Sequence, residues 1–206
     1  MKQIEGGVTA AKGFQAAGVE AGIKYKNRRD MALIYSTAPC TAAGTFTSNV
    51  VKAAPVVWDK KIVEESPAAR AVVVNSGIAN ACTGKQGMDC CAAESRCAAE
   101  SLGIPGDSVL VASTGVIGMQ LPLDRLTEGI RKLAAVKSDT LEAGSDAARA
   151  IMTTDTVPKE IAVTFEISGK TVTLGGMCKG SGMIHPNMCT MLGFLTTDLK
   201  ISKPML

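Results

Sequence analysis

Apolar positions along the chain recur with two periods, one typical of helices and one typical of strands. Residues 123–135 carry apolar side chains at helical spacing, and helices are also predicted at 88–102 and 140–152. Ile161 to Ile167 instead alternates apolar and polar residues, which predicts a half-buried strand. The dipeptide Ser168-Gly169 is typical of a turn, so a partner strand is expected at 171–174. Further strands are predicted at residues 31–37, 43–47, 69–74 and 108–112, and around 198–201.

The predicted helix at 88–102 separates its residue types by face. Met88 and Cys91 fall close to one face, whereas Glu94 and Arg96 lie elsewhere on the helical wheel. Gly103 follows as a stop signal. Helices and strands in this mixed order predict an α/β or α+β fold with some antiparallel pairing.

Composition narrows the class of protein. The chain has 206 residues, 46% apolar and 20% charged, as in a globular protein of one domain or two small ones. The net charge of +3 is too small to predict binding to nucleic acid or to an anionic membrane by bulk electrostatics. No apolar run reaches the roughly 18 residues of a membrane span. The first residues also lack the apolar stretch of a signal peptide, so a cytoplasmic protein is expected.

The cysteines and histidine do not predict a metal site. Seven cysteines form no CxxC pair, and His185 is the one histidine. His185 precedes a proline and is more typical of a turn than of a catalytic base, and no GxSxG motif offers it a serine nucleophile. The glycines also match neither a P-loop nor a dinucleotide-binding fingerprint.

Four segments are rich in small polar residues and glycine, and most lie near the end of a predicted element. They cover residues 75–84, 113–118, 153–156 and 175–192. Such segments often build sites in α/β proteins, although each is also explained by turn chemistry alone. In the last segment, the small residue Cys189 directly precedes Thr190. A threonine hydroxyl becomes a nucleophile when its own α-amine is freed by cleavage of the preceding bond, so Thr190 is a candidate.

The stretch from Lys179 to Leu192 (KGSGMIHPNMCTML) closely resembles the self-cleavage segment of the ornithine acetyltransferase family, also called glutamate N-acetyltransferase. Similar motifs occur in the family's order over nearly the whole chain. They are GGVTA from Gly6, FTSNVVKAAPV from Phe46, the Asn75–Gly84 segment, Ser113–Gly118 and TTDTVPK from Thr153. The resemblance implies a layered α/β (α+β) sandwich with a mixed β core, of which this chain is the N-terminal half.

The resemblance also implies roles for individual residues. Thr190 matches the nucleophile and Cys189–Thr190 the bond that is cut, while Thr114 and Gly115 match the oxyanion hole. Lys179 and Thr153 match substrate-binding positions, with neighbouring Thr154 as the alternative to Thr153. No metal or cofactor is implied.

The implied reaction moves an acetyl group from N-acetylornithine to glutamate through an acetyl ester on Thr190. Some family members also use acetyl-CoA as a substrate for glutamate acetylation. The family assembles as αβ heterodimers that pair further, so the expected partner is the chain's own β chain, with no nucleic acid and no membrane.

The chain departs from the family pattern in three places and in length. Cys178 and Cys189 stand where alanine is usual, and Ile78 replaces an asparagine. Family members are about twice as long, judged from the resemblance. Residues 1–189 therefore match an α-chain domain and 190–206 the start of a β chain, and weak or absent activity is expected of this chain alone.

The sequence is also compatible with three other functions. The first is a self-processing aminopeptidase or amidohydrolase with an N-terminal nucleophile, and the second is a non-catalytic fragment that needs a partner chain. A redox or metal role for the cysteines is the third.

Overall fold

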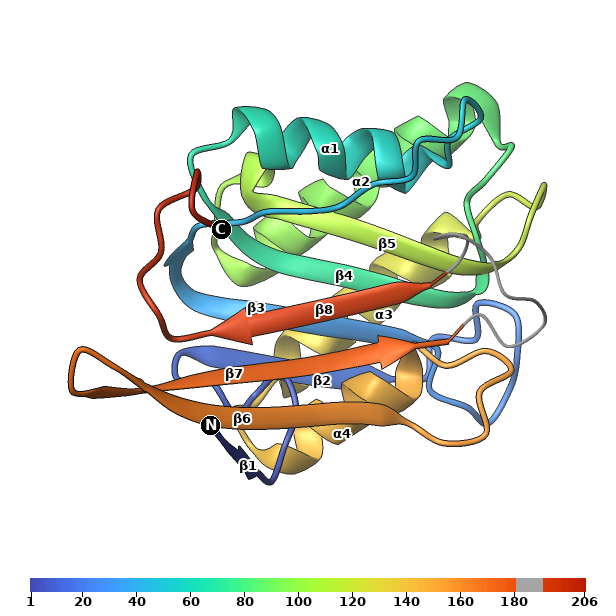
Figure 1. Ribbon diagram of the computed structural model, residues 1–206. Helices are drawn as coiled ribbons and strands as arrows, with labels where there is room; N and C mark the ends of the chain where they lie inside the picture. Colours follow the sequence, from blue (N-terminus) through green and yellow to red (C-terminus); the bar gives the residue numbers. More distant parts are fainter. Residues whose placement is uncertain (181–190) are drawn as a thin grey trace.

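The computed structural model describes residues 1–180 and 191–206 and arranges them around two four-stranded sheets (Figure 1). The first sheet has the order β2 (Phe14–Val19), β3 (Met31–Cys40), β4 (Ala69–Ile78) and β5 (Val109–Val116). The second has the order β1 (Lys2–Ile4), β6 (Lys159–Ile167), β7 (Lys170–Lys179) and β8 (Leu192–Thr197). All neighbouring strands are antiparallel except β4 and β5, which makes the first sheet mixed.

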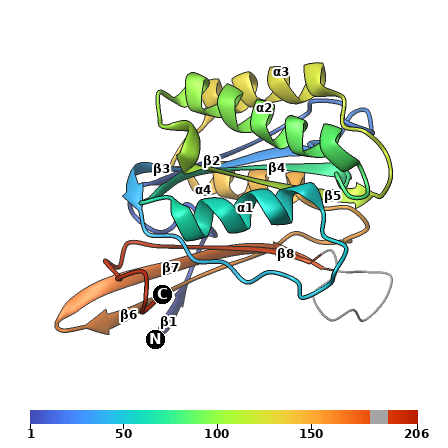
Figure 2. The same cartoon turned by 90° about the horizontal axis from the view of Figure 1, so that it is seen from above.

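The helices occupy three positions around the first sheet (Figure 2). α2 (Gly84–Leu102) and α3 (Leu123–Val136) cover its outer face, and α1 (Ala54–Glu65) lies along the free edge of β5. α4 (Leu141–Ala150) packs on the inner face, between the two sheets. A short 3-10 turn, Gly106–Ser108, precedes β5.

Strand β4 is buried on both faces, which explains its unbroken apolar run. Val73 packs with α2 and α3 in one core cluster, whereas its neighbour Val74 packs with α4 and the second sheet in another. Successive side chains of a strand point to opposite faces, so an apolar residue is needed at every position of a doubly covered strand.

The β4–α2–β5 unit sets the position of the candidate site. Because β4 and β5 are parallel, their carboxyl ends lie side by side, with Ser76 opposite Thr114 and Gly77 opposite Gly115. Carboxyl ends of neighbouring parallel strands are the usual place for a site in α/β folds. The resemblance and the strand order therefore point to the same edge of the sheet.

The free edge of β5 is protected by two side chains of α1. The indole N–H of Trp58 donates to the Val109 carbonyl over 3.2 Å, and a carboxylate oxygen of Asp59 accepts from the Val111 N–H over 2.8 Å. An unpaired strand edge would otherwise pair with another chain.

Most predicted elements are confirmed, and several predictions were wrong. The helices at 88–102, 123–135 and 140–152 correspond to α2, α3 and α4, and the strand at 161–167 with its partner corresponds to β6 and β7. Residues 43–47 and 198–201 form no strand. β1, β2, β8 and α1 had not been predicted.

Glu94 is the clearest local difference from the helical wheel. It lies off the apolar face predicted for α2, yet it is fully buried. The cause is that α2 is covered on more than one side, by the first sheet, by α3 and by α1. A face that appears polar in one helix is buried when a second helix packs on it.

Candidate active site

The two sheets meet where Lys179, the last residue of β7, reaches Thr114 near the end of β5. The Lys179 amine donates to the Thr114 hydroxyl over 3.3 Å, and both residues are buried. The two positions are 65 residues apart in sequence and belong to different sheets. The fold therefore brings together two residues that the resemblance assigned to one site.

Gly115, next to Thr114, adopts a backbone conformation that other residues rarely take. Its φ is +134°, and a Cβ at this position would lie 2.2 Å from the carbonyl carbon of Gly77. Gly77 in turn has φ +109° and faces the side chain of Lys24. Only glycine permits this approach, so the backbone path beside Thr114 depends on glycine at position 115.

The segment 153–156 joins the same region through Asp155. One carboxylate oxygen of Asp155 accepts from the Gly180 N–H over 2.8 Å and from the Lys159 amine over 2.6 Å. The other accepts from the Thr153 N–H over 3.3 Å. The Asp155 side chain is 4% exposed, so the carboxylate is an internal link between this segment and the end of β7.

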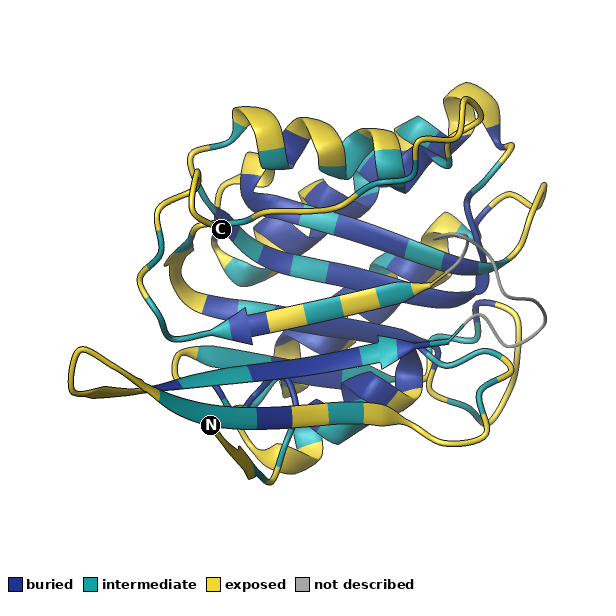
Figure 3. Ribbon diagram, viewed as in Figure 1, coloured by how far each residue is buried: buried dark blue, intermediate teal, exposed yellow. Residues whose placement is uncertain are grey.

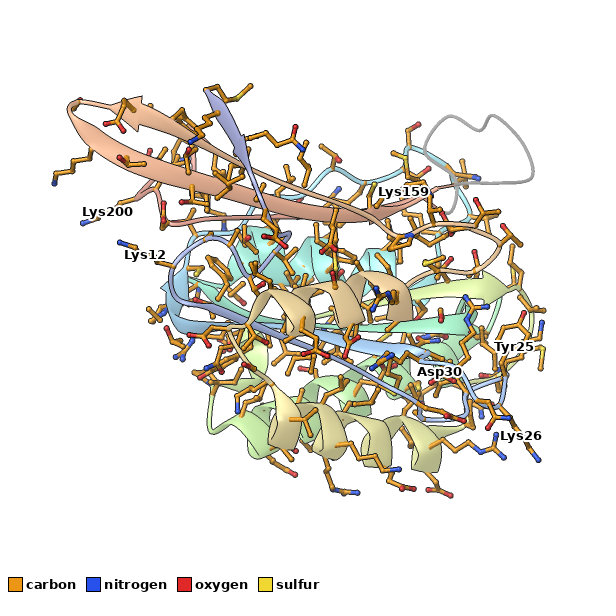
Figure 4. All side chains as sticks on the ribbon, turned by 90° about the horizontal axis from the view of Figure 1, so that it is seen from below. Lys12, Tyr25, Lys26, Asp30, Lys159 and Lys200 are labelled. Carbon is orange, nitrogen blue, oxygen red and sulfur yellow. The ribbon has the colours of Figure 1, made fainter. Side chains whose placement is uncertain are left out.

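Arg28 holds the same segment from the loop between β2 and β3. Its guanidinium donates to the carbonyl oxygens of Met152 and Thr153. Figure 4 places Tyr25 and Lys26 of this loop at the end of the molecule where Lys159 lies. Of the two threonine candidates, Thr153 is half-buried beside these contacts and Thr154 is exposed.

Two ionisable groups of the site have shifted pKa values. Burial would raise the pKa of Asp155, but the hydrogen bonds from Lys159, Gly180 and Thr153 outweigh it and hold the pKa at about 2. The pKa of Lys179 is lowered, first by desolvation and also by Lys159, while the charge of Asp155 opposes the shift. Asp155 is thus a fixed anion beside a buried amine.

The segment 75–84 divides between the site and turn chemistry. Asn80 accepts from the Thr83 hydroxyl and donates to the Gly87 carbonyl, which closes the turn into α2. The Asn75 amide donates to the Ile78 carbonyl. The hydrogen bonds of these polar residues are turn contacts, so the structure supports the turn interpretation for them.

Asp155 and Arg28 are site residues that the sequence patterns do not predict. Asp155 lay within the segment quoted as TTDTVPK, but its spacing of four residues from Lys159 predicts an ion pair only in a helix, and residues 152–158 form no helix. Nothing local in the sequence indicated Arg28, because its partners are more than 120 residues away. His185, Cys189 and Thr190 lie outside the described residues, so their predicted roles stay predictions.

The described part of the chain carries no group of three or more His, Cys, Asp or Glu side chains placed to hold a metal ion. Its six cysteines are free thiols. Within residues 1–180 and 191–206, no helix is long and apolar enough to cross a membrane.

An open groove of about 600 Å³ beside Trp58, Arg96 and Ile104 lies near the start of β5, and no candidate site residue lines it.

Comparison with known proteins identifies relatives of this chain. A relative from Symbiobacterium thermophilum, "Arginine biosynthesis bifunctional protein ArgJ", is 57% identical over 203 residues, which cover 98% of this chain and 50% of the relative. A protein of the same name from Thermosynechococcus vestitus is 50% identical and is covered over 48% of its length. The chain therefore spans about half the length of the curated relatives it matches.

Two solved structures share the fold. The crystal structure of ArgJ from Bacillus halodurans has a TM-score of 0.85 and 44% identity, over 92% of this chain and 97% of that one. Ornithine acetyltransferase from Mycobacterium tuberculosis, solved with ornithine, has a TM-score of 0.82 and 44% identity, over 88% and 95%. The expected layered α/β fold is confirmed by these structures.

The family described as the ArgJ family matches residues 15–206. With this match over nearly the whole chain, and with relatives about half identical along it, the chain belongs to the ArgJ family.

Proposed function

We propose that this chain is the N-terminal half of an N-acetyltransferase that moves an acetyl group from N-acetylornithine to glutamate. The observation that carries the proposal is the contact between Lys179 and Thr114. It places a buried cation at the carboxyl end of β5, next to Gly115. The names of the relatives and the ornithine bound to the Mycobacterium tuberculosis enzyme support the substrate class.

In the proposed reaction, Thr190 is first freed by cleavage of the Cys189–Thr190 bond. Its hydroxyl oxygen attacks the acetyl carbonyl of N-acetylornithine, the amide C–N bond breaks, and the amine of ornithine leaves with a proton. The amine of glutamate then attacks the acetyl ester, and the Thr190 hydroxyl is restored as N-acetylglutamate forms. Two half-reactions through one covalent intermediate are the pattern of nucleophilic catalysis.

The chain's other residues act on charge and placement. The Thr114 hydroxyl and the Gly115 N–H would stabilise the negative oxygen of each tetrahedral intermediate, a contribution whose loss costs about 100- to 1,000-fold in rate. Lys179 would bind a substrate carboxylate, and Thr153 is preferred to Thr154 because it is half-buried beside Arg28. No resident cofactor or metal takes part in this scheme, and acetyl-CoA is treated as an alternative acetyl donor.

The proposed partner is the C-terminal half of the protein, which would cover the outer face of the second sheet. Ile161, Gly176 and Leu195 form one cross-strand row on this face. Ile161 is 53% exposed and Leu195 is 76% exposed, and Figure 3 shows the alternating exposed positions along β6 and β8. Apolar side chains gathered on one face mark a surface that another chain buries.

The proposed location of the assembled enzyme is the cytoplasm.

The function is tested by mass and by acetyl transfer. The chain and its C-terminal half are produced as one polypeptide, and intact mass under reducing conditions is expected to show two products that divide between Cys189 and Thr190. Labelled N-acetylornithine is then expected to release ornithine in one burst before glutamate is added. Thr114→Ala should slow both steps about 100-fold or more, whereas Thr114→Ser, which keeps the hydroxyl, should retain most of the rate.

Other outcomes of these assays would indicate another function or a second acetyl donor. Steady release of acetate without glutamate would indicate the amidohydrolase, and an uncut polypeptide with no burst would indicate a non-catalytic protein. Acetylation of glutamate by acetyl-CoA in the same assay would show that this second donor is used. Loss of activity on reduction would indicate a role for the cysteines, and loss on chelation would indicate a role for a metal.

A further inference from the structure

Asp155 has more hydrogen bonds than an ion pair with Lys159 requires. Its carboxylate accepts from two backbone N–H groups, those of Thr153 and Gly180, in addition to the Lys159 amine. Gly180 follows Lys179 directly, and Thr153 lies in the segment that Arg28 also holds. One buried carboxylate therefore fixes two backbone segments, one at Thr153 and one directly after Lys179.

Two charged groups and one hydroxyl surround the Lys179 amine, each from a different part of the chain. Asp155 lies on the segment before β6, Lys159 begins β6, and Thr114 on β5 offers an uncharged hydroxyl to the amine. Asp155 is the anion among these groups, and it favours the charged amine, whereas burial and Lys159 disfavour it. A fixed negative charge next to a buried amine offsets part of the cost of desolvating that amine.

We propose that Asp155 is a positioning residue that holds Thr153 and Gly180 in place and keeps the Lys179 amine charged for a substrate carboxylate. The inference rests on the proposed substrate role of Lys179 and goes beyond it. Asp155 itself does not touch the substrate in this assignment. It acts through the residues on either side, by two backbone hydrogen bonds and by its charge.

A titration of Lys179 tests the electrostatic part without any acetyl transfer. The chain is labelled with ¹³C-lysine, the Cε–Hε signal of Lys179 is assigned with Lys179→Arg, and its shift is followed from about pH 7 to 11. In Asp155→Asn the midpoint is expected to fall by about one pH unit, a tenfold change in the charged-to-neutral ratio. In Lys159→Gln it is expected to rise, because a neighbouring cation is removed.

The opposite signs distinguish this role from a merely structural one. If the two substitutions only loosened the site, both would move the midpoint toward the ordinary value of lysine. Asp146→Asn is the matched control, because Asp146, on α4, pairs with Arg149 of the same helix and with Arg29 before β3, and its loss should leave the Lys179 midpoint unchanged. An unchanged midpoint in a folded Asp155→Asn chain would overturn the proposal. If Asp155→Asn fails to fold, Asp155→Ser takes its place, and a midpoint that is unchanged or raised in that folded variant overturns the proposal.

Hydrogen exchange tests the positional part. The amide hydrogens of Thr153 and Gly180 are expected to exchange at least about tenfold faster in Asp155→Asn than in Asp146→Asn. Equal exchange in the two variants would contradict the positioning role.

In the complete enzyme, Asp155→Asn should raise KM for the amino-acid substrate more at pH 9 than at pH 7, with a smaller change in kcat. If the unsubstituted enzyme shows no acetyl transfer, the proposed function fails, while the titration and exchange still decide the role of Asp155.

Discussion

Gly115 lies so close to Gly77 that a Cβ on Gly115 would be 2.2 Å from the Gly77 carbonyl carbon. The contact joins the carboxyl ends of the two parallel strands, at the residue that follows Thr114. A close backbone approach of this kind is possible only for glycine, and it determines where the Gly115 N–H lies.

Gly115→Ala is therefore expected to move the strand ends apart. Self-cleavage should slow about 100-fold or more, because an oxyanion donor displaced by even part of an ångström loses its alignment. The measurement is the fraction of cleaved polypeptide against time, by intact mass. Gly106→Ala is the control, since a Cβ there meets no heavy atom within 4 Å. Normal cleavage in Gly115→Ala would contradict the assignment of this residue to the oxyanion hole.

Glu94 should make stability depend on pH. It is fully buried, burial raises its pKa to about 8, and nearby Asp59, whose pKa burial raises to about 7, adds to the effect. A group with a raised folded pKa favours folding fully below its unfolded pKa, and this contribution is lost as the pH rises through the folded value. The free energy of unfolding should therefore fall between about pH 4.5 and 8.

Glu94→Gln should reduce that dependence, because the amide does not ionise and only the contribution of Asp59 is left. Urea unfolding at several pH values measures it, and Glu100→Gln, on the exposed side of the same helix, is the control. The same slope in Glu94→Gln and in the unsubstituted chain would show that Glu94 does not titrate in this range.

Trp58→Phe should weaken the edge of the first sheet. The change removes the N–H that donates to the Val109 carbonyl and keeps an aromatic ring on α1. A loss of about 1–2 kcal/mol is expected, since a partner of a shielded carbonyl is removed. Val57→Ala, an exposed neighbour on α1, should change stability by less than about 0.5 kcal/mol. Equal unfolding midpoints for Trp58→Phe and the unsubstituted chain would show that this hydrogen bond contributes nothing to stability.

Leu195→Lys should separate folding from assembly. Leu195 is 76% exposed on the outer face of β8, so the substitution is expected to leave the unfolding midpoint of the chain nearly unchanged. Binding to the separately produced C-terminal half should weaken at least about tenfold, measured by calorimetry. Val50→Lys, at a still more exposed position in the loop between β3 and α1, is the control. Undiminished binding in Leu195→Lys would place the partner on another surface.

Periodic segments were predictable because their own residues contain the signal. α3 buries Leu126, Ile130 and Leu133 at helical spacing, and β6 with β7 forms the hairpin that the alternation and Ser168-Gly169 predict. The mixed fold class and the family followed from such local patterns and motifs. Thr114, Gly115, Thr153 and Lys179 were named by resemblance alone.

Weakly patterned segments were missed for physical reasons. β2, with the sequence FQAAGV, has few β-branched residues and is a strand because β3 pairs with it. Residues 43–47 have a strand-like composition and no partner strand, so they form none. A strand is stable only when its backbone hydrogen bonds are satisfied across the sheet, which a single segment does not encode.

The sequence by itself determined the fold class, the family and the residue types available for chemistry. Only the tertiary structure decided which of them meet: Lys179 with Thr114 across two sheets, Asp155 with Gly180, and Arg28 with the Thr153 segment. The reason is that hydrophobic periodicity acts over a few residues, whereas these contacts join positions 25 to 125 residues apart. Such contacts exist only after both sheets have packed on α4, and the burial of Glu94 likewise depends on packing that no single helix reveals.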